Sequence, residues 1–199
     1  MSSLYQNDLS FLNDRGDIAL AGIDEAGRGA LAGPVVVAAV VLDYNKLIPG
    51  LNDSKKLSDI KRRQLYMKIL EQARGVSVVE VSAAEVDRIN VLQASILGFG
   101  LACNGLKLAI DYALIDGRDV PVAMKDKAQA IIKGDSIYAC IAAASIVAKV
   151  HRDDLMIALD DRFPQYGFAQ HKGYPTAQHY QALMDWGACP MHRQSYRLS

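Results

Sequence analysis

The chain has 199 residues, and its 22 basic and 22 acidic side chains leave no net charge at neutral pH when histidine is counted as neutral. Hydrophobic residues make up 51% of the chain, enough to bury a sizeable core, which excludes global disorder. A protein that binds nucleic acid through bulk charge is usually much more basic, so any such binding must come from local patches.

The first elements in chain order alternate between apolar runs and polar loops. The first dozen residues are polar, and we expect them to be loosely held. Residues 18–24 form a short apolar run typical of a strand, and residues 35–42 are rich in β-branched side chains, as in a strand buried on both faces. Ser58 can cap a helix that runs to about Ala73, and residues 75–82 alternate as a third strand does.

The second half of the chain predicts two more strands and three helices. Helical character begins near residue 83, and a longer helix is expected over residues 91–110. Residues 112–115 and 130–133 are typical of buried strands. The strongest helical periodicity covers residues 136–161. An irregular loop over 163–175 precedes a last short helix that Thr176 can cap. This order predicts a mixed α/β fold with helices on the faces of the sheet.

The sequence carries no signal for secretion or for a structural disulfide or zinc site. Cys103, Cys140 and Cys189 are widely spaced and form no CxxC pair. The N-terminus lacks the basic region and apolar run of a signal peptide. The longest wholly apolar run, residues 35–42, is too short to span a bilayer. We therefore expect a soluble cytoplasmic protein.

Carboxylates follow three of the predicted strands. Asp24 and Glu25 end the first strand, Asp116 follows the fourth, and Asp135 comes shortly after the fifth. A carboxylate beside a buried run is costly unless it is paired, hydrogen-bonded or bound to a metal. Carboxylates that converge repel one another and need a cation, for which Mg²⁺ or Mn²⁺ is suited by hard oxygen ligands. Two such ions can activate a water and stabilise the leaving oxygen in phosphodiester hydrolysis.

Each acid also has an ordinary structural interpretation. Asp116 with Gly117 is typical of a turn, and Asp135 could cap the helix that follows it. Asp24 and Glu25 could be an ordinary edge pair. Adjacent strand residues point to opposite faces, so these two can share a site only if the strand twists or bulges there. The glycines that follow them make such an irregularity plausible.

Seven ordered motifs closely resemble those of the bacterial ribonuclease HII family. They are GIDEAGRGALAGPV at 22–35, LNDSKKLS at 51–58, IDG at 115–117, KGDS at 133–136, AAASIVAKVHRD at 142–153, HKGYPT at 171–176 and HRQSY at 192–196. Together they span roughly residues 18–196, nearly the whole chain. Ala30 stands where many members have proline, a departure that puts little in doubt.

The resemblance implies a fold and an activity. The fold would be α/β: a ribonuclease H-like mixed five-stranded sheet flanked by helices, with a small C-terminal helical portion. Residues 1–199 would form one catalytic domain, in which about 163–199 is an extension that contacts the substrate. The activity would be cleavage of the RNA strand of RNA–DNA hybrids, and of single ribonucleotides embedded in duplex DNA, to give 5′-phosphate and 3′-hydroxyl ends.

The resemblance also implies site residues and a cofactor. Asp24, Glu25, Asp116 and Asp135 match the family's four catalytic and metal-binding acids, which would hold two Mg²⁺ or Mn²⁺ ions together with the substrate. On this basis we expect a metal-dependent endonuclease whose binding partner is a nucleic-acid duplex.

Substrate contacts follow in the same way. Gly27, Arg28 and Gly29 match the family's strand-reading loop, and Tyr174 matches the tyrosine that packs on the sugar. Glycines let backbone N–H groups approach a sugar-phosphate closely, and only the 2′-hydroxyl marks a ribose. Lys55 looks like a phosphate contact, although a loop lysine is usually just solvated. Lys56 is a phosphate-contact candidate of the same kind. Weaker candidates for the duplex-binding face are Lys172, His179, His192, Arg193 and Arg197.

Two alternatives and several expected absences complete the sequence interpretation. A non-catalytic binder of hybrid duplexes would need the basic loops but no metal, and a small-molecule phosphohydrolase would give the glycine-rich loop and Tyr174 no purpose. The chain ends three residues after HRQSY without a clamp-binding tail, so a sliding-clamp contact is not expected. We predict no protein partner and expect a monomer. The lack of an extra N-terminal domain argues against the related ribonuclease HIII.

Overall fold

A mixed five-stranded sheet forms the centre of the computed structural model, which describes residues 2–16 and 18–199. The strand order is β3-β2-β1-β4-β5. β1 pairs antiparallel with β2 and parallel with β4; β3 and β5 extend the two edges. The strands are β1 (Leu20–Ala26), β2 (Val35–Val41), β3 (Gly75–Val81), β4 (Tyr112–Asp116) and β5 (Ala128–Ile131). The predicted mixed sheet is confirmed.

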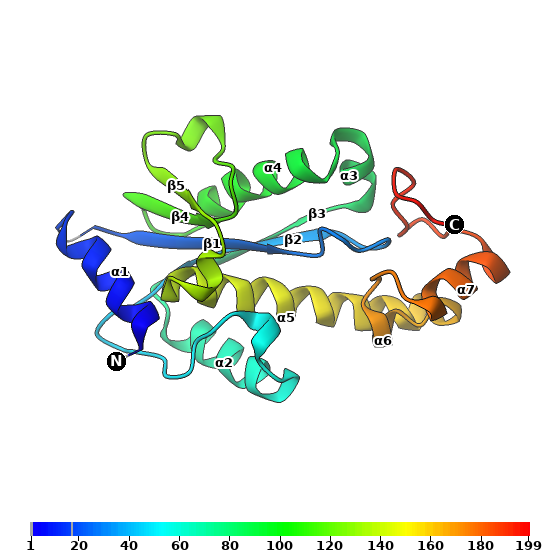
Figure 1. Ribbon diagram of the computed structural model, residues 1–199, viewed down its shortest axis with the longest axis horizontal. Helices are drawn as coiled ribbons and strands as arrows, with labels where there is room; N and C mark the ends of the chain where they lie inside the picture. Colours follow the sequence, from blue (N-terminus) through cyan, green and yellow to red (C-terminus); the bar gives the residue numbers. More distant parts are fainter. Residues whose placement is uncertain (1, 17) are drawn as a thin grey trace.

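Helices cover both faces of the sheet (Figure 1). On one face lie α1 (Ser3–Asn13), α2 (Asp59–Gln72) and the long α5 (Ala139–Arg162). On the other face lie α3 (Ala83–Ile89) and α4 (Val91–Asn104). The far end of α5 reaches beyond the sheet to a small C-terminal unit that contains α6 (Phe168–His171) and α7 (Ala177–Trp186).

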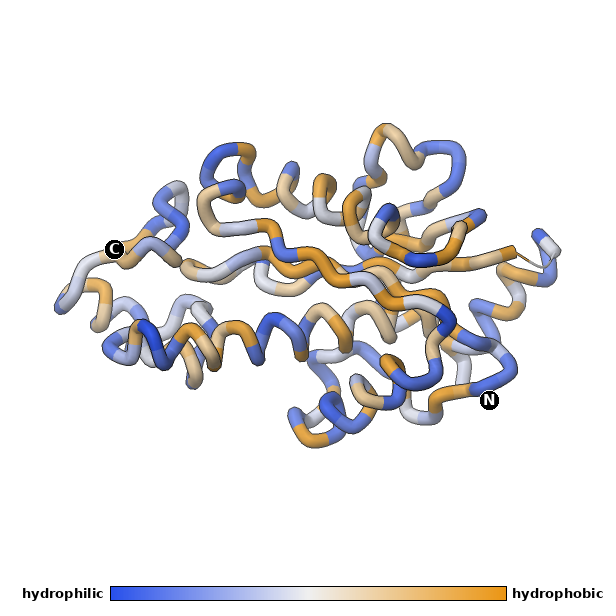
Figure 2. The backbone as a smooth tube through the Cα atoms, turned by 180° about the vertical axis from the view of Figure 1, so that it is seen from behind, coloured by the Kyte–Doolittle hydropathy of each residue, from blue (hydrophilic) through white to orange (hydrophobic). Residues whose placement is uncertain are grey.

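Strand β2, which lies next to the central strand β1, is buried along its whole length because helices pack on both of its faces. Every residue from Val35 to Val41 is at most 1% exposed. Val36, Ala38 and Val40 belong to the core beneath α5, whereas the residues between them belong to the core beneath α4. The tube in Figure 2 is accordingly hydrophobic along the middle of the sheet. The prediction of a strand buried on both faces is confirmed.

The N-terminal segment is a helix, so the prediction that it is loosely held is wrong. α1 buries Leu4, Tyr5, Asp8 and Phe11. The Asp8 carboxylate accepts hydrogen bonds from the backbone N–H groups of Ala139 and Cys140, at 2.8 and 2.9 Å. These are the first two residues of α5, whose own N-cap side chain makes no such bond. A residue from α1 therefore caps the helix that packs against the centre of the sheet.

We expect Asp8→Ala to lower the free energy of unfolding by about 2–4 kcal/mol, because it leaves two helix N–H groups and the Tyr44 hydroxyl without their buried acceptor. Burial raises the pKa of Asp8 to about 6, so the carboxylate is charged at pH 7.5, where urea unfolding should be measured. Asp14→Ala is the control, since Asp14 is an exposed acid just after the C-terminal end of α1. Equal stability of the two variants would contradict the capping role.

Several predicted boundaries shift by a few residues. The helix expected over 91–110 ends at Asn104, where Gly105 follows, and the fifth strand lies two residues earlier than expected. The long helix begins at Ala139, after a 3₁₀ turn at Gly134–Ser136. Asp135 therefore lies in that turn and is not the helix cap that the sequence allowed. The loop expected over 163–175 contains a 3₁₀ turn, Pro164–Tyr166, and the short α6.

Candidate active site

The four predicted acids come together at one end of the sheet. β1 and β4 run parallel, with Ile23 level with Ile115, so one further residue along each strand brings Asp24 level with Asp116. The turn that carries Asp135 follows β5, and the backbone N–H of Gly134 donates to Asp116 Oδ1 at 2.7 Å. Parallel strands place their carboxyl ends at one edge of the sheet, which explains why acids distant in sequence meet there.

Asp24 is almost fully buried, with 3% of its surface exposed. Burial raises its pKa well above the ordinary value, and the neighbouring carboxylates of Glu25 and Asp116 raise it further. The Ser145 hydroxyl and the backbone N–H of Glu25 oppose this rise, and the N–H donates to Asp24 Oδ1 at 2.7 Å. These contacts therefore do not offset the cost of keeping Asp24 ionised at this buried position beside other carboxylates.

Glu25 reaches the site without the strand irregularity that the sequence suggested. The β1–β2 pairing is regular through Ala26, so the strand has no bulge at these acids. Burial raises the pKa of Glu25, and the Arg28 guanidinium, 3.1 Å from its Oε1, lowers it only in part. The Asp116 carboxylate again acts to raise it. Glu25 and Asp24 are adjacent in a regular strand, so their side chains start from opposite faces of the sheet. Glu25 is nevertheless linked to the other acids by its electrostatic interaction with Asp116.

Lys55 supplies positive charge beside the acids. Its ammonium group lies 3.4 Å from Asp135 Oδ2 and 3.9 Å from Asp53 Oδ1. Burial lowers the pKa of Lys55, but the carboxylates of Asp135, Asp24 and Asp53 outweigh this and raise it. For Asp116, burial raises the pKa and Asp135 adds to the rise. The lysine therefore offsets only part of the negative charge of the four acids.

The donor set fits a divalent cation, although it does not form a complete cage. Glu25 Oε2 is buried and has no hydrogen-bond partner among the described residues. Within residues 2–16 and 18–199, no three His, Cys, Asp or Glu side chains are arranged to hold a metal ion by themselves. Mg²⁺ commonly binds to one or two carboxylates, while water and substrate phosphates supply the other ligands. An open set of mutually repelling carboxylates suits this mode of binding.

A cleft of about 470 Å³ lies beside the acids. Its lining includes Glu25, the Gly27–Gly29 segment, Lys55 and Tyr174, so the predicted substrate residues share one surface. A larger cavity of about 640 Å³ lies where β1 begins, near Leu20, and contains none of the predicted site residues. We therefore assign the site to the smaller cleft, because Glu25 lines it together with Lys55, whose ammonium group pairs with Asp135.

The segment after β1 forms a tight turn at the cleft. The Ala30 N–H donates to the Gly27 carbonyl at 3.3 Å, and Gly27 has a φ of +97°, which favours glycine. Arg28 and Gly29 are exposed at the tip. The Arg28 side chain, 46% exposed, pairs with Glu25 and leaves donors free to face a ligand.

Tyr174 lies on a loop that two buried histidines support. His179 Nδ1 is 3.0 Å from the Tyr174 carbonyl oxygen, and His179 Nε2 is 3.0 Å from His192 Nε2. The Cys189 N–H donates to His192 Nδ1 at 3.0 Å, an arrangement that favours the tautomer with the His192 proton on Nε2. Burial lowers the pKa of His179 to about 4, so both rings are neutral near pH 7. Neutral imidazoles thus link the C-terminal segment to the backbone of Tyr174.

Three of the weaker duplex-binding candidates are wrong. His179 and Arg193 are 0% exposed and His192 is 2% exposed, so none of them can contact a duplex. Sequence alone predicted a basic surface where the chain folds these groups inward. Arg197 and Lys56 are exposed, but Lys56 does not line the cleft. The Lys172 ammonium donates to the Ala169 carbonyl, which ties it to α6.

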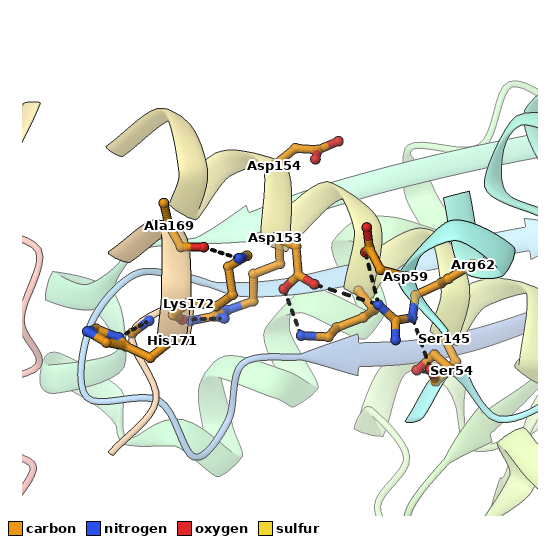
Figure 3. Close-up of polar contacts among 12 residues, drawn as sticks. Ser54, Asp59, Arg62, Ser145, Asp153, Asp154, Ala169, His171 and Lys172 are labelled. Atoms are coloured by element: carbon orange, nitrogen blue, oxygen red, sulfur yellow. Dashed lines mark hydrogen bonds and ion pairs between the residues drawn. The ribbon is translucent and has the colours of Figure 1, made fainter. Parts of the chain in front are cut away.

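The structure adds residues that sequence reasoning missed. Ser145 and Lys149, one turn apart on α5, line the cleft together with Ser54. The Ser54 and Ser145 hydroxyls hydrogen-bond at 2.8 Å. Figure 3 shows this pair and also Asp153, which lies further along α5 and binds Lys149 at 2.7 Å. The four-residue spacing of Ser145, Lys149 and Asp153 was a signal for one shared helix face.

Comparisons with known proteins identify a family. A family model described as Ribonuclease HII matches residues 21–199. Ribonuclease HII of Acinetobacter baylyi is 48% identical over 177 residues, which cover 89% of this chain and 94% of that protein. Ribonuclease HII of Francisella tularensis subsp. novicida is 47% identical over 178 residues, which cover 89% and 96%.

Solved structures share the fold. Ribonuclease H2 from Pyrococcus horikoshii OT3 matches with a TM-score of 0.75 at 27% identity, covering 91% of this chain and 95% of that chain. The RNase HII solved in complex with PCNA from Archaeoglobus fulgidus matches with a TM-score of 0.78 at 29% identity, covering 92% and 96%. Within the described residues, no helix has the length and apolar character needed to cross a membrane.

Proposed function

The chain belongs to the ribonuclease HII family and is a ribonuclease H, and on that premise we propose that it is a metal-dependent endonuclease for RNA–DNA hybrids and for single ribonucleotides embedded in duplex DNA. The proposed products carry 5′-phosphate and 3′-hydroxyl ends. The observation that carries the proposal is the cluster of four acids, of which Asp24 and Asp135 are buried, beside a cleft lined by a glycine turn and a tyrosine. A cytoplasmic location and a monomeric state stay predictions, as does the extent of the substrate-contacting extension.

The acids are proposed to hold divalent ions. Asp24, Glu25, Asp116 and Asp135 would contribute the protein ligands, and substrate phosphate oxygens would complete the set. When bound, such ions supply positive charge that stabilises the charge developing on the phosphate and on the leaving 3′-oxygen. The raised pKa values of three of the acids support this role, because a nearby cation would remove the cost of keeping them ionised.

The chain's own groups are proposed to orient the substrate. At the exposed tip of the Gly27–Gly29 turn, Gly29 has no side chain, so its backbone can approach a ribose closely. Arg28 is placed to hold a phosphate while it keeps Glu25 oriented. The half-buried ring of Tyr174 presents a flat apolar face for a sugar, and Lys55 carries charge to a phosphate near Asp135.

The two alternative functions are less well supported. In a non-catalytic binder, four carboxylates beside the duplex would repel its phosphates and weaken binding. A small-molecule phosphohydrolase would not need an exposed turn and a tyrosine at one end of the cleft.

We expect the protein to cleave duplexes that contain one or four ribonucleotides but not the matched all-DNA duplex. Cleavage should require Mg²⁺ or Mn²⁺ and stop when EDTA removes the metal. The measurement is gel analysis of end-labelled duplexes, with the 5′-phosphate and 3′-hydroxyl ends tested by enzymatic religation or labelling.

Each failure points to a different function. Binding of all ribonucleotide-containing duplexes without cleavage would favour the non-catalytic binder. Inhibition by a free nucleotide but not by a hybrid duplex would favour a small-molecule phosphohydrolase. Cleavage that persists in EDTA would contradict the metal dependence.

A further inference from the structure

Two arginines lie buried behind the glycine turn and Tyr174. Arg152 on α5 and Arg193 near the C-terminus are both 0% exposed. In the part of the chain that the structure describes, neither forms an ion pair with a carboxylate; their donors go to backbone carbonyls and to the Tyr196 hydroxyl. Burial lowers the pKa of both groups, to about 10 for Arg152. Apolar side chains fill a core without the desolvation cost of a buried charge. The groups to which these two cations donate therefore indicate why arginine is used here.

Arg152 joins the segment after β1 to the loop before Tyr174. Its Nε donates to the Pro34 carbonyl and its Nη2 to the Ala32 carbonyl, both at 3.0 Å. Its Nη1 donates to the Lys172 carbonyl at 2.9 Å. The guanidinium carbon lies 5.1 Å from the centre of the Tyr174 ring. One planar group therefore fixes the spacing between the two elements that line the cleft.

The lack of a side chain at Gly27 leaves the space that the Arg152 guanidinium group occupies. A Cβ atom at Gly27 would lie 2.0 Å from Arg152 Nε, far inside van der Waals contact. The turn consequently packs directly on the guanidinium group, and its φ of +97° adds a second reason for glycine there. The buried cation thus lies immediately beneath the turn that we propose reads the ribose.

Arg193 controls which way the turn's peptide groups face. Its Nη1 donates to the Arg28 carbonyl at 2.9 Å, and the Tyr196 hydroxyl donates to the same oxygen at 2.6 Å. The Arg28 carbonyl therefore points inward. The chain has no cis peptide among the described residues, and in a trans peptide the N–H points opposite to the carbonyl. The Gly29 N–H is thus directed away from Arg193.

We propose that Arg152 and Arg193 are positioning residues for ribose recognition, whose buried guanidinium groups hold the Gly27–Ala30 turn and the Tyr174 loop as one preformed surface. The proposal rests on the proposed function, since it assigns these two elements to the ribose. Arg193 draws the Arg28 carbonyl inward and so leaves the Gly29 N–H for the ligand, while Arg152 holds the chain on either side of the cleft. Two cations behind the cleft also make its potential more favourable for a phosphate.

The test measures a selectivity ratio, defined as the dissociation constant of an all-DNA duplex divided by that of the same duplex with one ribonucleotide. It is measured by fluorescence anisotropy in the Asp116→Asn background, so that cleavage does not interfere. We expect Arg193→Lys and Arg152→Lys each to lower the ratio by about tenfold, because one ammonium group cannot hold several carbonyls in the guanidinium geometry. Partial unfolding reduces both apparent affinities by the same factor and leaves the ratio unchanged.

Arg62→Lys is the matched control. Arg62 is also largely buried, and it donates to two backbone carbonyls, those of Ser54 and Leu57, at 2.9 and 2.8 Å. It holds the turn that carries Lys55 rather than the glycine turn. We therefore expect Arg62→Lys to weaken binding of both duplexes to a similar degree and to keep the selectivity ratio of the parent.

The outcomes separate the proposal from the function on which it rests. A parent ratio near one would overturn the proposed ribose specificity itself. A high parent ratio that both folded arginine variants keep within twofold would show that the arginines serve stability alone. If neither arginine variant folds, Tyr196→Phe decides: it removes one of the two donors to the Arg28 carbonyl, and we expect the ratio to fall about threefold. Tyr166→Phe is its control, because that hydroxyl bonds the Gly187 carbonyl instead; equal ratios would overturn the proposal.

Discussion

Asp116→Asn is expected to slow cleavage of a duplex with one ribonucleotide by roughly a thousandfold or more, while the duplex still binds. Asparagine has nearly the same shape as aspartate, and its carbonyl oxygen can still accept the 2.7 Å hydrogen bond from the Gly134 N–H. The substitution therefore removes a charge and leaves the local backbone in place. Single-turnover cleavage and duplex binding, measured side by side, separate loss of catalysis from loss of affinity.

Stability should not fall in this variant. Burial and the Asp135 carboxylate both raise the pKa of Asp116, so its charge is a cost in the metal-free protein. We expect the thermal midpoint without metal to stay the same or to rise. The control is Asp119→Asn, an exposed aspartate three residues further along the same loop, which should cleave normally. Normal turnover by Asp116→Asn would show that this acid is not part of the catalytic centre.

The sequence predicted the four acids because strand ends are local features. Asp24, Asp116 and Asp135 each follow or closely trail an apolar run, and the parallel pairing of β1 with β4 brings the first two level. The resemblance to one family then supplied the role of Glu25. No local pattern showed how Glu25 joins the site, because the strand is regular and charge coupling across space makes the connection.

The N-terminal helix carried a signal that the polar composition concealed. Leu4, Asp8 and Phe11 recur at helical spacing, and all three are buried. An aspartate in such a row is unfavourable in a core unless other groups of the fold donate hydrogen bonds to its carboxylate. Here the uncapped start of α5, more than a hundred residues later, provides that need. A tertiary cap of this kind has no sequence signature.

The basic C-terminal residues were misjudged for a related reason. A sequence shows that Arg193 and His192 are polar, but it does not show which carbonyl groups distant segments will offer them. Arg193 finds partners at Arg28 and Gly33, about 160 residues earlier. Long-range acceptors can bury a polar side chain as completely as a core leucine, and only the folded arrangement reveals this.

Gly22→Ala is expected to lower the free energy of unfolding by about 3 kcal/mol or more, and with it the cleavage activity. A Cβ atom at this position would lie 2.1 Å from the Cys140 carbonyl carbon and 2.4 Å from the Ile141 nitrogen. Both contacts are backbone atoms of α5, so no side-chain rotation relieves them and the helix must move away from β1. Urea unfolding measures the loss of stability.

Activity should suffer beyond the loss of folded protein, because the same contact places Ser145 against Asp24. Gly22 and Asp24 lie two residues apart on β1 and so face the same side of the sheet, towards α5. Moving α5 outward therefore moves the Ser145 hydroxyl, which lowers the pKa of Asp24, away from that carboxylate. We expect single-turnover cleavage per folded molecule to fall at a temperature at which most of the variant is folded.

Gly100→Ala is the control, because Gly100 lies inside α4 and a Cβ there would meet nothing within 4 Å. Alanine favours the helix, so this variant should gain about 0.5–1 kcal/mol of stability and cleave normally. Both variants add a single methyl group. The expected changes in the free energy of unfolding have opposite signs because the added group meets backbone atoms of α5 at Gly22 and open space at Gly100. A Gly22→Ala protein as stable and active as Gly100→Ala would mean that α5 does not press on β1, and the argument that this contact aligns Asp24 would fail with it.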